Sequence, residues 1–166
     1  MTMPTIADTL AFIRLAHVGQ VDKAGRPYHE HPTRVLAILN WLFPDAPDSA
    51  RHAALLHDVL EDTLVTATDL LARGYDEETV EIVQLVTRDL HDGLTYHERI
   101  GKLAAGSSVW ARAVKLADNV DNSVRARLAL VRSDERDRLA RRYARARHML
   151  GTALIADGLL KEIPKP

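Results

Sequence analysis

The sequence contains no cysteine among its 166 residues. Disulfide bridges and thiolate-bound metals are therefore excluded, and any metal must be held by histidine, carboxylate, other oxygen ligands or water. No apolar run approaches the roughly 20 residues of a membrane span. Residues 1–8 lack the basic and then apolar pattern of a signal peptide. These absences predict a soluble, cytoplasmic protein with no membrane partner.

The sequence also has no overall excess of positive or negative charge, since its formal net charge is −1. Nucleic acid is therefore an unlikely partner for the chain as a whole. Residues 125–148 are an exception, with nine arginines and three acids. This segment is interpreted as an amphipathic helix with a solvated basic face. The alternatives are a surface for a polyanionic substrate, a homo-oligomer interface and an RNA-binding face.

Aromatic residues make up only 5% of the chain, and no stretch alternates apolar and polar residues convincingly. Apolar residues recur instead every three or four positions, which predicts helices almost throughout. The length fits one domain of about 100–200 residues, so residues 1–166 are expected to form a single all-α helical bundle. The tail from Gly158 is expected to fray. Helices are predicted at about 5–18, 31–42, 47 to at least 58, 66–74, 76–88, 95–106, 108–130 and 133–155.

Residues 53–63 place several polar residues within a stretch that is otherwise apolar and helical in pattern. His57 and Asp58 are adjacent, and Glu61 follows one turn later. On a continuous helix, residues three and four apart share a face, so Glu61 would lie near both. An imidazole and a carboxylate suit a divalent transition metal, and a further carboxylate could handle protons. The alternative for such a pair alone is a helix end carrying polar residues.

Four separated stretches resemble one family in order and spacing. They contain the motifs Tyr-x-x-His-Pro, His-Asp-x-x-Glu-Asp-Thr, Val-Thr-Arg and Lys-Leu-Ala-Asp, within residues 16–32, 55–63, 86–88 and 114–122. Together they are similar to the HD-domain hydrolases of the RelA/SpoT family, in the free-standing small alarmone hydrolase form. The resemblance implies a helical HD domain and covers about two-thirds of the chain.

By position, the resemblance implies four metal ligands: His31, His57, Asp58 and Asp118. This mixture of N and O donors accommodates Mn²⁺, although spacing does not exclude Fe, Zn or Co. A bound ion would acidify water and shield phosphate charge. The other six histidines are expected to be structural or surface residues.

The same resemblance assigns the catalytic role of orienting and deprotonating water to Glu61 and Asp62; a helix-ending polar residue is the alternative for Asp62. It also matches Lys23 to a residue that meets phosphate or base and Asn122 to one that contacts the nucleoside. By their position or charge, Tyr28, Arg88 and Lys115 are further candidate substrate-binding residues. Lys23 could instead be a solvated loop lysine, and Tyr28 a packing residue. For Arg88 the alternative is a surface ion pair, and for Lys115 a side chain that covers its helix.

Two positions depart from the long bacterial members. Asp22 stands where they place an arginine that stacks on guanine, and Asp121 begins Asp-Asn-Ser-Val where they commonly read His-Asn-Met-Arg. The residues expected to hold the metal and the water are present, while those around the base differ. The function expected is a metal-dependent 3′-pyrophosphohydrolase of (p)ppGpp-like alarmones, which are stringent-response nucleotides. The alternatives are hydrolysis of ppApp, a nucleoside monophosphate or a dinucleotide, and a non-catalytic nucleotide or RNA sensor.

Overall fold

The computed structural model describes residues 2–22, 25–89, 91–124 and 133–165. Nearly all regular structure in this part of the chain is helical, so the expected all-α fold is confirmed. The loop between the first two helices closes through one antiparallel bridge, between Val21 and Pro27. The helices are α1 (Ile6–Ala16), α2 (Glu30–Leu42), α3 (Asp48–Leu56), α4 (Val59–Asp62), α5 (Ala67–Ala72), α6 (Glu77–Val86), α7 (Tyr96–Ala105), α8 (Val109–Ser123) and α10 (Ser133–Ala156).

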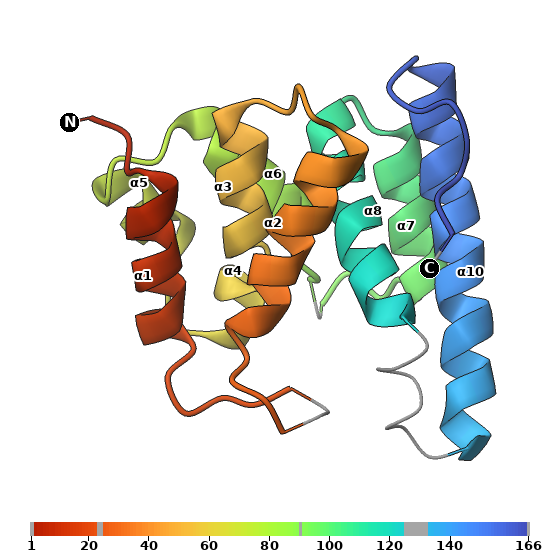
Figure 1. Ribbon diagram of the computed structural model, residues 1–166, viewed down its shortest axis with the longest axis horizontal. Coiled ribbons are helices and arrows are strands. Elements are labelled where there is room, and N and C mark those ends of the chain that lie inside the picture. The colour runs from red at the N-terminus through yellow and green to blue at the C-terminus, as the bar shows by residue number, and fades with distance from the viewer. Residues whose placement is uncertain (1, 23–24, 90, 125–132, 166) are drawn as a thin grey trace.

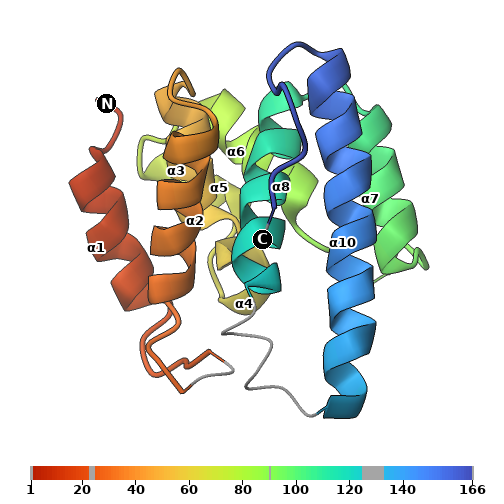
Figure 2. The same ribbon diagram turned by 45° about the vertical axis from the view of Figure 1, so that its right-hand side comes forward.

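Helix α8 lies between the two sides of the bundle. It contacts α2, α3 and α6 on one side and α7 and α10 on the other, while α1 and α10 lie at opposite ends of the molecule (Figures 1 and 2). Ala111, Ala113, Ala117 and Leu116 of α8 are fully buried. Small alanine side chains let neighbouring helices approach closely, and this packing fixes where the polar end of α8 lies.

Several helix starts follow the local sequence. Thr66 and Asp69 form the start of α5, and Thr95 and Glu98 that of α7, each as a reciprocal capping box. In this motif the threonine oxygen accepts the N–H three residues on, and the acid accepts the threonine N–H. Asp76 caps α6 in a simpler way. These three predicted starts are confirmed.

The third helix is shorter than predicted. Helix α3 ends at Leu56, and α4 begins at Val59, so His57 and Asp58 lie at the junction of two helices. The φ, ψ values of Asp58 are −103° and −5°, which stay in the right-handed region but differ from those of a regular α-helix. Because the helix is interrupted here, spacing along a continuous helix does not determine which groups His57, Asp58 and Glu61 contact.

The C-terminal part packs more firmly than its sequence predicts. Leu139, Ala146, Leu150 and Leu154 bury one stripe of α10. The tail then turns back, with Leu159 and Leu160 packed against the core and Ile163 against Gly151. The prediction of a frayed tail is therefore wrong, because the tail supplies apolar side chains to the bundle. Helix α8 ends at Ser123, and the rest of its predicted extension, residues 125–130, lies outside the described residues.

Within the described ranges, no helix is both long enough and apolar enough to cross a membrane.

Candidate metal centre and adjoining cavity

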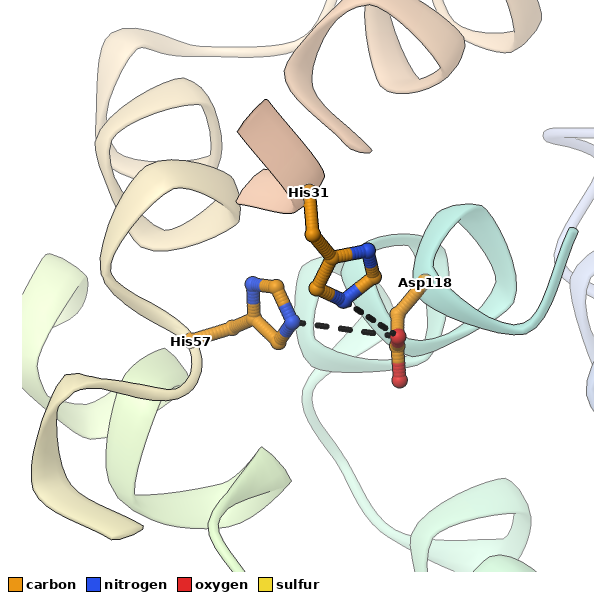
Figure 3. Close-up of side chains that lie close together, drawn as sticks. All are labelled: His31, His57 and Asp118. Atoms are coloured by element: carbon orange, nitrogen blue, oxygen red, sulfur yellow. Dashed lines mark ion pairs between the residues drawn. The ribbon is translucent and has the colours of Figure 1, made fainter. Parts of the chain in front are cut away.

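Two imidazoles and two carboxylates converge where the starts of α2 and α4 meet α8. His31, His57 and Asp118 each offer one ligand atom, and these atoms lie within 4.8 Å of one another (Figure 3). The Nε2 atoms of His31 and His57 are 3.3 Å and 3.8 Å from Asp118 Oδ1. Asp58 Oδ2 lies 3.6 Å and 2.9 Å from the same two nitrogens. The four residues expected to bind metal are thus brought together.

The outward-facing nitrogen of each imidazole has an oxygen partner. His57 Nδ1 lies 2.9 Å from the carbonyl oxygen of Ala54. This carbonyl is in the last turn of α3, where carbonyls lack the next intrahelical donor. His31 Nδ1 lies 2.7 Å from Asp121 Oδ2. Since a carbonyl and a carboxylate only accept hydrogen bonds, both Nδ1 atoms donate, and both Nε2 atoms face the cluster, where each can bind a metal once its proton is lost.

The cluster fits a divalent metal ion. Two ligands that each lie about 2.0–2.2 Å from a metal are separated by roughly 3 Å, close to the separations found here. His57 Nε2 is buried and has no hydrogen-bond partner among the described residues, although Asp58 is near. A buried nitrogen without a partner is destabilising, and a metal ion would satisfy it. The cluster could therefore hold a metal through nitrogen and oxygen donors.

The charges in this cluster are strongly coupled. Burial alone would lower the pKa of His31, but hydrogen bonds to Asp118 and Asp121 raise it to about 9. Burial would raise the pKa of Asp58, yet His57 and His31 hold it well below its ordinary value. Burial also opposes ionisation of Asp118, whose pKa is lowered by Lys115 and the two imidazoles. The carboxylates are therefore ionised and suited to a cation.

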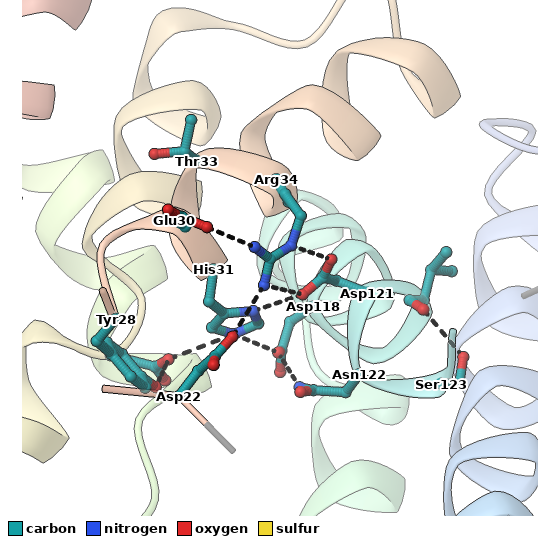
Figure 4. A network of polar contacts seen from close by, with 12 residues as sticks. Asp22, Tyr28, Glu30, His31, Thr33, Arg34, Asp118, Asp121, Asn122 and Ser123 are labelled. Carbon is teal, nitrogen blue, oxygen red and sulfur yellow. Dashed lines mark hydrogen bonds and ion pairs between the residues drawn. The ribbon is translucent and has the colours of Figure 1, made fainter. Parts of the chain in front are cut away.

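Three of the predicted substrate-binding residues contact the cluster's carboxylates. The Tyr28 hydroxyl donates to Asp58 Oδ2 at 2.6 Å, and Asn122 Nδ2 donates to Asp118 Oδ1 at 2.5 Å (Figure 4). Lys115 Nζ is 2.9 Å from Asp118 Oδ2. These three side chains therefore lie around the cluster and hold its carboxylates.

The two predicted catalytic acids lie on α4, apart from the imidazoles. The Glu61 carboxylate accepts the Arg88 backbone N–H at 3.1 Å and lies 2.9 Å from its guanidinium. Arg88 thus forms an ion pair, which was the alternative to substrate binding for this residue. The Asp62 side chain is exposed, while its carbonyl accepts from Gln20 Nε2 at 2.8 Å.

A cavity of about 510 Å³ adjoins the cluster and is bounded by α6, α7, α8 and α10. Glu61 and Lys115 belong to its lining, and Lys115 connects it to the cluster through its contact with Asp118. Sequence reasoning missed most of its polar lining, because those residues match no motif. They include Tyr96, Arg99, Lys102, Arg142 and the acids Glu81, Asp89 and Asp92.

The basic helix divides its arginines between solvent and the interior. Arg136, Arg138, Arg141 and Arg145 are exposed, as the amphipathic interpretation expects. Arg142 stacks over the Tyr96 ring at 3.8 Å, and Arg147 donates to Ser123 at 2.8 Å. The inward arginines belong to the cavity wall and the α8–α10 contact.

Asp22, at the altered base-recognition position, points inward. Its side chain is 4% exposed, accepts the Arg26 N–H at 3.1 Å and lies 3.7 Å from the Arg34 guanidinium. Lys23, predicted to bind substrate, lies outside the described residues.

The family model described as "HD domain" matches residues 28–123, more than half of the chain, and includes all four converging residues. The chain belongs to the HD-domain family. This HD protein is similar to a guanosine-3′,5′-bis(diphosphate) 3′-pyrophosphohydrolase of Vibrio cholerae, with 35% identity over 149 residues. It is 33% identical over 149 residues to the bifunctional (p)ppGpp synthase/hydrolase SpoT of Escherichia coli K12.

Each of these two alignments covers 83% of this chain and 20% of the relative, so the HD chain spans about a fifth of their length. A solved structure, described as a metazoan ortholog of SpoT that hydrolyzes ppGpp, matches with a TM-score of 0.75 and 26% identity. That match covers 96% of this chain and 100% of the other.

Proposed function

We propose that this chain is a metal-dependent phosphohydrolase that removes the 3′-pyrophosphate of (p)ppGpp-like alarmones, with Mn²⁺ as its ion. The observation that carries the proposal is the convergence of His31, His57, Asp58 and Asp118. The names of the relatives that align with this region support the choice of substrate.

The four converging residues would hold the ion through Nε2 and carboxylate oxygens. When bound there, a divalent ion supplies Lewis acidity, which polarises a phosphate oxygen and makes water more acidic. Tyr28 and Asn122 orient the two carboxylates by donating to them, so each carboxylate keeps its direction as substrate enters. Lys115 offers a positive charge between Asp118 and the cavity.

Glu61 and Asp62 orient the attacking water and take its proton. The water oxygen bonds to the phosphorus on the 3′-oxygen, the bond from phosphorus to that oxygen breaks, and the 3′-oxygen is protonated. Pyrophosphate leaves and the 5′-diphosphate nucleoside remains. Arg88 fixes Glu61 on the cavity wall, and Lys102 and Arg142 add positive charge for the phosphates there. Lys23 is assigned to the phosphate or base by its motif.

The base is a separate question, and one observation favours a second candidate substrate. Asp22 is buried against Arg34, so no guanidinium from that position stacks on guanine. Hydrolysis of another nucleotide with a 3′-pyrophosphate, such as ppApp, uses the same metal and water machinery.

Product analysis of the purified protein with Mn²⁺ and ppGpp tests the proposal, with ppApp and nucleoside monophosphates as parallel substrates. We expect release of pyrophosphate and GDP, and loss of turnover after chelation that Mn²⁺ restores. Cleavage of ppApp alone would keep the chemistry and change the substrate. Binding without turnover of any of these nucleotides, retained in Asp118→Ala, would overturn the enzyme and favour a sensor.

A further inference from the structure

Asp121 is a buried acid at the end of α8 that the predicted ligand set does not include. It follows Asp118 by three residues, and its side chain is 3% exposed. Its Oδ2 lies 2.7 Å from His31 Nδ1, on the side of the imidazole that faces away from the cluster (Figure 4). We propose that Asp121, held by Arg34, is a positioning residue that fixes His31 in the tautomer and orientation needed to bind metal. This inference rests on the metal site of the proposed function.

The chemistry of the contact decides the tautomer. An ionised carboxylate only accepts hydrogen bonds, so His31 Nδ1 carries a hydrogen, and when the ring gives up its second proton to bind a metal, the lone pair is on Nε2. A carboxylate behind a ligating imidazole also makes the ring a more basic ligand. His57 has only the neutral carbonyl of Ala54 in the equivalent place. His31 is therefore the ligand whose affinity for metal depends on a charged neighbour.

Arg34 holds the carboxylate from the other side. It is one turn after His31 on α2, so the imidazole and the guanidinium reach α8 together. Arg34 Nε donates to Asp121 Oδ1 at 2.9 Å, and a terminal nitrogen lies 3.4 Å from Oδ2. This two-point contact restricts rotation of the carboxylate and supplies a countercharge for it. Asp22 and Glu30, 3.7 Å and 3.8 Å from Arg34, hold the guanidinium in turn.

The Asp121→Asn variant tests the pair with almost no change in volume. An asparagine has only one side-chain oxygen to accept hydrogen bonds from His31 and Arg34. Its NH₂ group must therefore face one of these two donors. We expect Mn²⁺ to bind about 10–100-fold more weakly, the range found when a group supporting a metal ligand is removed. Mn²⁺ affinity is read from the electron paramagnetic resonance signal of the free ion, and Co²⁺ absorption reports the ligand geometry.

Asp121→Ala should weaken binding similarly. In Asp121→Asn combined with Arg34→Met, the amide oxygen is free to turn to His31, and we expect tighter Mn²⁺ binding than in Asp121→Asn alone. Asp48→Asn is the matched control, since it makes the same change in an exposed carboxylate that pairs with Arg51 away from the cluster, and it should leave Mn²⁺ affinity near that of the parent.

These measurements need no substrate, so they separate this inference from the proposed function. Absence of ppGpp hydrolysis by the parent with intact Mn²⁺ binding would overturn the function alone. Parent-like Mn²⁺ affinity and Co²⁺ spectra in both Asp121→Asn and Asp121→Ala would overturn the role of Asp121. Helical circular dichroism and urea unfolding identify a variant that fails to fold. If Asp121→Ala is such a variant, the comparison of Asp121→Asn with the double variant decides.

Discussion

Raising the pH should destabilise the metal-stripped protein, because His31 lies among carboxylates. Its pKa rises from 6.5 to about 9 in the folded state. A group with a raised pKa contributes stability that is complete below its unfolded value and lost as the pH passes its folded value. At roughly 1.4 kcal/mol per pKa unit, the free energy of unfolding should fall by about 3 kcal/mol between pH 6.5 and 9. His57, whose pKa is also raised, acts in the same direction.

The assay is urea unfolding in a chelator, followed by circular dichroism at several pH values across this window. His31→Gln is the control, because it removes the titrating group and should flatten most of the profile. Metal affinity should change in the opposite sense and increase with pH, since protons compete with the ion for His31 Nε2. A level free energy of unfolding in the parent protein, or the same slope in His31→Gln, would refute the reasoning.

Three further variants test the site and the scaffold. His57→Ala should lose both bound Mn²⁺ and hydrolysis, measured by metal content and product release; retention of both would exclude this residue as a ligand. Glu61→Gln should keep Mn²⁺ but lower turnover about 10²–10⁴-fold, as expected for loss of a general base, and an unchanged rate would remove this acid from the mechanism. Asp157→Ala leaves the guanidinium of the buried Arg112 without its carboxylate partner. It should reduce the free energy of unfolding by about 1–3 kcal/mol, and a urea midpoint equal to that of the parent would contradict this.

Local signals predicted much of the fold, because helix starts depend on neighbouring residues. Thr66 and Thr95 carry their own capping partners three residues ahead, so those starts needed no tertiary information. The tail was mispredicted because Gly158 and the prolines suggest a frayed end, while Ile163 finds its packing partner on α10. This contact depends on the chain turning back along α10, which leaves no periodic pattern in the sequence.

The four converging residues were found because their motifs resemble those of a family. What surrounds them was less accessible. Asp121 follows Asp118 by one turn, and Arg34 follows His31 by one turn, so each lies beside a recognised residue. That spacing shows only a shared face of one helix. Their pairing at 2.9 Å requires α2 and α8 to pack side by side.

The sequence by itself determined the all-α fold class, several helix starts, the exclusion of sulfur ligands and the residue types available to a metal, since these follow from composition and local contacts. Only the tertiary structure decided which groups those residues face. The interruption between α3 and α4 places His57 and Asp58 at a junction, and packing of α2 against α8 brings His31 to Asp118 and Asp121. Hydrogen bonds and ion pairs act over a few ångströms, so their partners are fixed when helices distant in the sequence pack together.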